Sequence, residues 1–177
     1  RYTDVEYPQI GNVAGVSFAS TAGALVPVTG YYMGTALLAG ATYGSEASGV
    51  RASTAAEFAN RDAFVLSNGA GANRFPLRGG TDAGDVATPI TAAEARVILE
   101  EAFTVMSRAR AQIRQPLDSR AQVTISLVDT RGQVLGLVRS PDAPIFGIDV
   151  SLQKARTANF FSGRFAANDL LSAGGEV

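Results

Sequence analysis

The residues with the clearest chemical potential lie in one short stretch, GIDVSLQKARTANFF, at residues 147–161. On a helix, Val150, Lys154, Thr157 and Phe161 would share one face at steps of four, three and four residues. An ammonium and a hydroxyl beside apolar side chains suit a flat, largely apolar ligand that carries anionic groups. We therefore predict that Lys154 meets an anionic ligand group or an acidic partner.

Lys154 is also the only lysine in the chain, whose other basic residues are all arginine. This bias is typical of a GC-rich genome, so the lone lysine can equally be an accident of codon usage. Two further interpretations stay open: Lys154 extends its charge into solvent, and the Thr157 hydroxyl bonds back to its own helix. A second helical face carries small residues and is expected to approach another backbone closely; it consists of Ser151, Ala155, Ala158 and Ser162.

The composition excludes several classes of chemistry. The chain has 177 residues with no histidine and no cysteine, which rules out a Ser-His-Asp triad, disulfides, thiolate chemistry and His- or Cys-ligated metals. A net charge of -1 leaves no electrostatic footprint for nucleic acid or an anionic membrane, and 46% hydrophobic residues indicate a globular protein. The missing cysteines are compatible with an exported protein.

Acidic and amide side chains offer few other candidate sites. Asn68, Asn73, Asp82 and Asp85 could supply oxygen ligands to calcium, but their spacing does not match an EF-hand loop, and a solvated loop explains them as well. Asp129 follows a predicted strand, where a turn former is favoured over a catalytic carboxylate. We therefore expect these acidic and amide side chains to lie in loops and turns rather than in a metal or catalytic site.

The elements that must position these residues start with a helix at residues 91–113. Thr91 and Glu94 have the spacing of a capping box, and Pro116 follows the helix. The apolar positions recur at three- and four-residue steps and predict one buried stripe. This stripe contains Ala95, Ile98, Leu99, Ala102, Val105, Met106, Ala109 and Ile113.

Alternating side chains then predict an antiparallel hairpin of residues 122–129 and 133–139. A second helix follows at residues 148–161, with a short helix around residues 166–172. Upstream, residues 63–67 predict a short strand. Two strands cannot cover two helices, so we expect a third strand beside the hairpin.

Residues 12–44 are mostly apolar and small. Pro27 and the many glycines argue against a membrane span, and the spacing of Gly30 and Gly34 fits a tight turn as well as a helix contact. We expect an apolar Gly/Ala-rich extension at residues 1–60 and a turn-rich lead-in at residues 61–89.

Three matching pieces give the chain a family resemblance: ITAAEARVILEEAF, VTISLVDTRGQVLGLVR and SPDAPIFGIDVSLQKARTANFF. Together they resemble the GlcG/HbpS family of haem-binding or haem-degrading domains over residues 90–165. The last piece is the most specific one, and RFPLRGGTD is similar to the lead-in of longer relatives. Residues 90–177 are then expected to form a partial domain of this family.

The resemblance implies an α+β domain whose antiparallel sheet is packed by helices, association into oligomers, and in some members haem. It makes Lys154, Thr157, Val150 and Phe161 the candidate cofactor-binding residues, with Thr157 as the candidate iron ligand. Other branches use histidine, which is absent here, so a tyrosine such as Tyr31, Tyr32 or Tyr43 is an alternative oxygen ligand.

Relatives continue beyond the second helix with roughly three further strands, near the usual strand count of a sheet. We therefore expect the sheet to be completed by a missing segment, by another chain or by the N-terminal apolar residues. The first and last residues suggest a processed or partial polypeptide.

Three functions remain open from the sequence. The first is a haem- or tetrapyrrole-binding module of an exported bacterial protein, periplasmic or extracellular, acting as a homo-oligomer or with another chain. The second is a structural or assembly domain with a vestigial ligand site. The third is an enzyme that degrades haem or acts on a small molecule, although no catalytic residue can be assigned.

Overall fold

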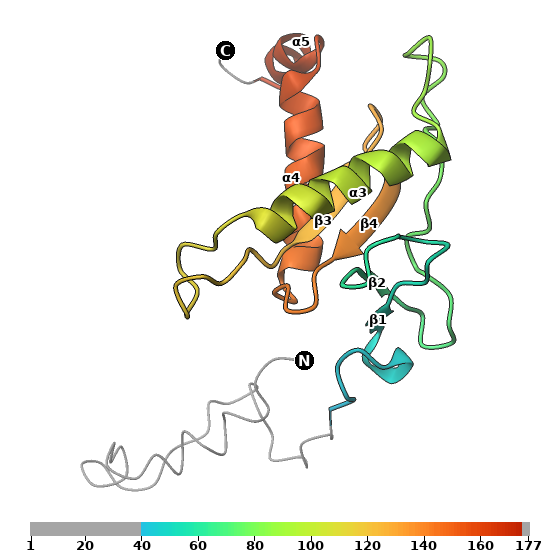
Figure 1. The fold of residues 1–177 in the computed structure, drawn as a ribbon. Helices are drawn as coiled ribbons and strands as arrows, with labels where there is room; N and C mark the ends of the chain where they lie inside the picture. Colours follow the sequence, from blue (N-terminus) through green and yellow to red (C-terminus); the bar gives the residue numbers. More distant parts are fainter. Residues whose placement is uncertain (1–39, 175–177) are drawn as a thin grey trace, which may run out of the picture. The chain divides into compact units, whose positions relative to one another are not determined.

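The computed structural model describes residues 40–174, of which residues 42–174 belong to one compact unit. Its elements follow the chain as a 3₁₀ turn η1 (Glu46–Ser48), β1 (Val50–Ala52), β2 (Phe64–Leu66), α3 (Ala92–Arg108), β3 (Thr124–Val128), β4 (Val134–Arg139), α4 (Gly147–Ser162) and α5 (Ala166–Ser172). Figure 1 shows helices packed on an antiparallel sheet. The predicted α+β class is confirmed.

The sheet has four antiparallel strands in the order β1-β2-β4-β3. β3 and β4 form the predicted hairpin, with Thr124 opposite Arg139 and a shift in register between Leu127 and Val128. Asp129 lies in the turn, where its Oδ1 accepts hydrogen bonds from the N–H groups of Arg131 and Gln133. Its interpretation as a turn former is confirmed.

The third strand beside the hairpin comes from this chain. β2, predicted at residues 63–67, pairs with β4 through Phe64 and Arg139, and β1 pairs with β2. β1 was not predicted from the sequence. Within residues 40–174 the outer edge of β3 has no neighbouring strand. Completion of the sheet there by a missing segment or another chain stays a prediction.

Helix α3 covers one face of the sheet. Thr91 caps it through the predicted capping box with Glu94. Leu99, Phe103 and Met106 pack with Val65 and Val138 of the sheet in one buried cluster. Alternate strand residues point to opposite faces, so Val138 of β4 joins this cluster whereas Leu137 joins the cluster on the other face. Gly136 lies on this face, where the side chains of Leu99 and Leu77 occupy the space that a side chain would need.

The predicted stripe of α3 was partly wrong. Ala95, Leu99, Phe103 and Met106 are buried, whereas Ile98 and Val105 are 42% and 67% exposed. Only the side of α3 that contacts the sheet is buried. Compared with the predicted stripe, this side includes Phe103 and leaves out Ile98 and Val105. Ala102 is half-buried and Ala109 is exposed.

Helix α3 also ends earlier than predicted, at Arg108 rather than near residue 113. The residue after it, Ala109, is extended, and its carbonyl accepts a hydrogen bond from the N–H of Ala121. The loop that follows closes on itself through a bond from the N–H of Ala111 to the carbonyl of Ser119. These bonds replace the next turn of helix and leave Ile113 96% exposed.

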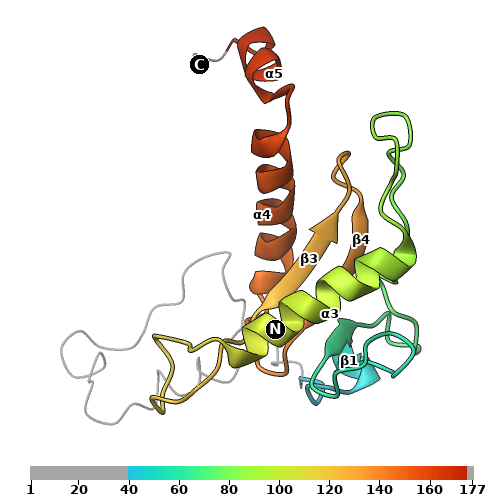
Figure 2. The same ribbon diagram turned by 45° about the horizontal axis from the view of Figure 1, so that its top comes forward.

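Helix α4 covers the opposite face of the sheet, as the turned view in Figure 2 also indicates. Ile148 and Leu152 pack near Leu137 of β4 and Leu66 of β2. The hydroxyl oxygens of Ser126 and Ser151 lie 2.6 Å apart, so the small side chain of Ser151 lets α4 approach β3 closely. The predicted helices at residues 148–161 and 166–172 are both confirmed.

A fully buried arginine fixes the loop before α4. The guanidinium of Arg139 donates from Nη1 to Thr124 Oγ1 at 3.0 Å and from Nη2 to the Ala143 carbonyl at 2.7 Å. The salt bridges of the described residues do not include Arg139. A buried charge is costly unless hydrogen bonds satisfy it, so these contacts determine where the chain enters α4.

Two buried aspartates form a reciprocal clasp between residues 81–82 and the β3–β4 turn. Asp82 Oδ2 accepts from the N–H and hydroxyl of Thr130 at 3.0 and 2.7 Å. Asp129 Oδ2 accepts from the N–H and hydroxyl of Thr81, both at 2.9 Å. Each aspartate is 3% exposed. Asp82 therefore belongs to a buried contact and not to a solvated loop.

Hydrogen bonds set the ionisation of this clasp. Bonds from the Thr130 hydroxyl and N–H hold the pKa of Asp82 below its ordinary value. Burial alone would raise the pKa of Asp129, but the hydrogen bonds from Thr81, Gln133 and Arg131 together outweigh it and lower the pKa. Both carboxylates therefore stay ionised in the folded protein near neutral pH.

Among the described helices, none is long and apolar enough to cross a membrane. Most of the apolar stretch 12–44, with Gly30 and Gly34, lies outside the described residues.

Gly136→Ala should destabilise the fold by about 1 to 3 kcal/mol, because overpacking forces neighbouring side chains out of their preferred positions. An added Cβ would lie 2.7 Å from Leu99 Cδ1 and 2.9 Å from Leu77 Cδ2. Urea unfolding measures the change. Gly147→Ala is the matched control, since its Cβ would meet only Thr124 Oγ1 at 3.8 Å. Equal stability of the two variants would contradict the close approach of α3 to β4.

Asp129→Asn should lower the free energy of unfolding by roughly 1 to 3 kcal/mol near neutral pH, because charge-assisted hydrogen bonds are lost. Since the folded pKa of Asp129 is lowered, its contribution is complete above the ordinary value of 3.8 and is lost as the pH falls through the folded value. The variant should therefore lose stability less steeply on acidification than the wild type. The exposed Asp118→Asn serves as control, and wild-type-like acid curves for both variants would refute the clasp.

Candidate functional site

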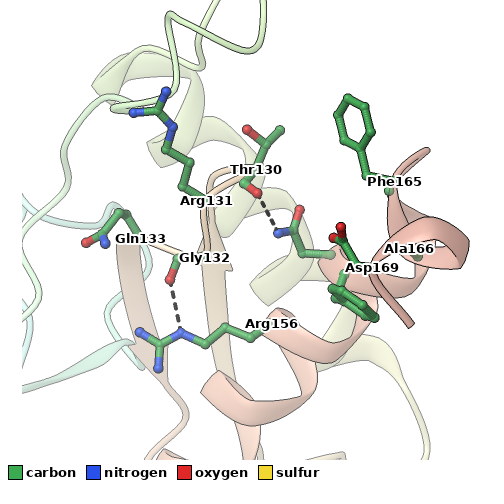
Figure 3. Close-up of a pocket in the computed structure, with 11 residues that line it drawn as sticks. Thr130, Arg131, Gly132, Gln133, Arg156, Phe165, Ala166 and Asp169 are labelled. Carbon is green, nitrogen blue, oxygen red and sulfur yellow. Dashed lines mark hydrogen bonds between the residues drawn. The ribbon is translucent and has the colours of Figure 1, made fainter. Parts of the chain in front are cut away.

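The β3–β4 turn, the C-terminal half of α4 and α5 enclose an open groove of about 470 Å³. Figure 3 shows its lining, with Thr130, Arg131 and Gln133 of the turn on one side and Phe165 and Asp169 on the other. We call this cavity the turn groove. Its walls combine guanidinium groups with phenyl rings, so it can accept a ligand that is partly apolar and partly anionic.

Two hydrogen bonds join α4 to the turn wall of this groove. Arg156 Nε donates to the Gly132 carbonyl at 3.0 Å, and Asn159 Nδ2 donates to the Thr130 carbonyl at 2.9 Å (Figure 3). The clasp of Asp82 and Asp129 holds the same turn from its other side. Arg131 is held separately by Asp85 at 2.6 Å, and this ion pair raises the pKa of Arg131. The turn is therefore fixed from several directions.

The four residues predicted from the sequence lie on the outer side of α4. Lys154 and Thr157 are exposed, Phe161 is 64% exposed and Val150 is half-buried. None of them lines the turn groove, which takes Arg156, Asn159 and Phe160 from the neighbouring face of the same helix. The helix thus brings the predicted residues together on one surface, but not inside the described cavity.

Lys154 was predicted to meet either an acidic side chain or an anionic ligand group. All salt bridges within residues 40–174 involve arginine, so no acidic group of the described chain pairs with this ammonium. An anionic ligand group stays a prediction. The small-residue face is divided: Ser151 and Ala155 are half-buried, with Ser151 bonded to Ser126 of β3, whereas Ala158 and Ser162 are exposed.

The alternative tyrosine ligands gain no support. Tyr43 stacks on Phe64 with ring centroids 6.2 Å apart, and its hydroxyl accepts a hydrogen bond from Arg139 Nη2 at 3.4 Å. Tyr31 and Tyr32 lie outside the described residues. Tyr43 therefore contributes to the packing around the buried arginine.

The candidate calcium ligands do not converge. Among the described residues, no group of three or more acidic side chains could hold a metal ion. Asn68 accepts from the N–H groups of Ala70 and Ala72, and Asn73 accepts from the N–H of Phe75, so both stabilise turns. Asp82 and Asp85 bind Thr130 and Arg131 respectively.

Sequence reasoning missed the residues that line the turn groove. Arg156, Asn159 and Phe165 gave no periodic signal, because their role depends on the turn that packs against α4. A partial clue was available. Arg156 and Asn159 are three residues apart, and such residues share a helical face.

The side chains on the outer face of α4 fit a haem in their chemistry. Thr157 offers an oxygen ligand, and Phe161 at i+4 is 64% exposed on the same helical face. Phe160 at i+3 lines the turn groove instead. Lys154 adds a cation one turn earlier. The chain has no histidine or cysteine, and the Thr157 hydroxyl is the candidate iron ligand that the sequence predicts on this surface.

The region that contains the outer face of α4 was compared with known proteins. No curated protein and no solved structure matches the chain. A family model does match, over fewer than half of the residues, and the matched segment runs from within α3 to within α5. Residues 97–170 match the family described as haem degrading protein HbpS-like, in agreement with the resemblance found in the sequence for residues 90–165.

Proposed function

We propose that this protein binds haem or a related tetrapyrrole on the outer face of α4. The observation that carries the proposal is the exposed Thr157, with the exposed ring of Phe161 four residues later on the same helical face, within the segment that matches the HbpS-like family. Phe161 and the half-buried Val150 offer apolar contacts to a porphyrin, and Lys154 offers an ammonium to a propionate. Thr157 is the proposed iron ligand.

In this proposal the protein would supply orientation, an oxygen ligand and a positive charge, while redox chemistry would belong to the iron itself. No catalytic residue is assigned. Haem degradation would need a proton donor near the ligand, and the matched segment offers no histidine for that role.

The proposed site is one-sided, because the outer face of α4 is exposed within the described chain. A flat apolar ligand gains most when both of its faces are removed from water. We therefore propose that a second copy, or another chain, covers the ligand. In the part of the chain that the structure describes, the outer edge of β3 has no neighbouring strand and could offer backbone groups to such a partner.

For the source we propose an exported bacterial protein, periplasmic or extracellular. The cysteine-free composition and the strong preference for arginine over lysine support this assignment.

A second candidate function is assembly without a ligand. Several large apolar side chains near the ends of α4 and on α5 are exposed, and clustered apolar surface often marks a protein interface. They are Ile145, Phe146, Phe161, Phe165 and Leu171. In this interpretation Lys154 and Thr157 are remnants of a ligand site, and the apolar residues contact a neighbouring subunit.

Haem titration of the purified full chain, followed by its visible absorbance, tests the proposed function. The wild type should give a saturable Soret band. Lys154→Ala should weaken binding by about 1 to 3 kcal/mol through loss of a charge-assisted contact. Thr157→Val should change the iron spectrum, because an oxygen ligand is replaced by a methyl group of similar shape.

Arg61→Ala is the matched control, since it also removes one positive charge, from an exposed residue that lies outside α4. Its affinity and spectrum should equal those of the wild type. A saturable Soret band that is identical in all four proteins would place haem elsewhere. Absence of any such band would favour the assembly function.

A further inference from the structure

A second cleft, of about 320 Å³, is lined by three arginines that no predicted function uses. Arg74 and Arg78 come from the segment RFPLRGG before α3, and Arg156 comes from α4. Phe75 and Pro76 add an apolar part to the lining, and Gln133 adds an amide. We call this cavity the arginine cleft. It shares Gln133 and Arg156 with the turn groove, so the two cavities adjoin at these residues.

The positive charge in the arginine cleft is not balanced by acidic side chains of residues 40–174. Among these residues, no aspartate or glutamate lines the cleft. In the described part of the protein the arginines in salt bridges are Arg51, Arg96, Arg114 and Arg131, each paired with a carboxylate elsewhere. Three like charges around one small cavity repel one another, in a protein whose net charge is only -1. An anion in the cleft would remove this repulsion.

Two of the guanidinium groups are already oriented. Arg78 Nε donates to the Val134 carbonyl at 2.5 Å, and Arg156 Nε donates to the Gly132 carbonyl at 3.0 Å. These carbonyls flank Gln133. The backbone N–H of Arg78 also donates to the Leu135 carbonyl at 3.0 Å, which ties this residue to β4. Because the bonds from Nε hold each side chain, less conformational entropy is lost when a ligand binds.

The terminal nitrogens of these groups remain available. Arg78 Nη2 makes only a long contact of 3.5 Å to Gln133 Oε1, and Arg156 uses Nε alone for its hydrogen bond to the turn. Terminal guanidinium nitrogens bind carboxylate or phosphate oxygens in pairs, a geometry that lysine cannot reproduce. The cavity volume lies near the lower limit of small-molecule sites. A ligand here must therefore be small.

We propose that the arginine cleft binds a small dianionic oxyanion, with a phosphoryl group or a pair of carboxylates as the recognised chemistry. Arg78 and Arg156 make the oriented contacts, and Arg74 adds charge at the cleft. The proposal rests on the arginine cleft alone and is independent of haem on the outer face of α4.

Isothermal titration of the full chain at low ionic strength, with inorganic phosphate in one arm and succinate in the other, tests this site. At least one anion should bind saturably, and Arg156→Gln should weaken it by at least about tenfold, the loss expected for one charge-assisted contact. Arg156→Lys keeps the charge but removes the planar pair of donors, so it should weaken binding too. Binding only to phosphate would identify a phosphoryl group, and binding only to succinate would identify paired carboxylates.

Arg61→Gln is the matched control, because Arg61 is exposed and does not line the cleft. It should bind like the wild type. Arg78→Gln gives a second test at the cleft, and circular dichroism checks that it folds. If Arg78→Gln does not fold, Arg156→Gln still tests the site, because it leaves the contacts of Arg78 intact. Equal affinities of Arg156→Gln and Arg61→Gln, or no saturable binding of either anion, would overturn the proposal. Neither result would change the expected haem titration.

Discussion

Burial of β4 on both faces is the constraint on which the rest of this structure depends. Residues Leu135 to Ser140 are all buried, with β3 on one edge, β2 on the other and a helix over each face. A strand in this position can tolerate a polar side chain only if its hydrogen bonds are satisfied, and Arg139 largely meets that condition through Thr124 and the carbonyl of Ala143. It can tolerate a bulky helix above it only where a side chain is missing, which is the role of Gly136 beneath Leu99.

The position of α4 follows from this central strand. Arg139 fixes the loop that leads into the helix, Ser151 brings the helix onto β3, and Arg156 and Asn159 tie its later turns to the hairpin. These contacts use one side of α4 and leave the other side, with Lys154 and Thr157, exposed. The two adjacent cavities and the outer face thus arise from one helix whose rotation is set by its packing. A shift of α4 would disturb all of them together.

The sequence predicted those features that depend on local patterns. The capping box of Thr91, the alternation of the hairpin and both later helices needed only residues close in the chain. Features set by distant partners were missed. Ile98 and Val105 look identical in type to buried residues, and only the width of the contact with the sheet leaves them exposed. Asp82 looked like a loop residue because its partner, Thr130, is 48 residues away. For the same reason the outer face of α4 was predicted, while the residues of the two cavities were not.

The arrangement of charge shows why composition alone conceals a site of this kind. A near-neutral total excludes a uniformly basic surface, yet it allows local imbalance if acidic residues are used elsewhere. Here carboxylates are used to bind Arg51, Arg96, Arg114 and Arg131, and in the clasp, where Asp82 and Asp129 accept hydrogen bonds from threonines. That distribution leaves Arg74, Arg78 and Arg156 together at a cleft without acidic lining. Positive and negative charges nearly cancel in the sequence, but in the folded protein three arginines lie together at the cleft while the carboxylates pair elsewhere.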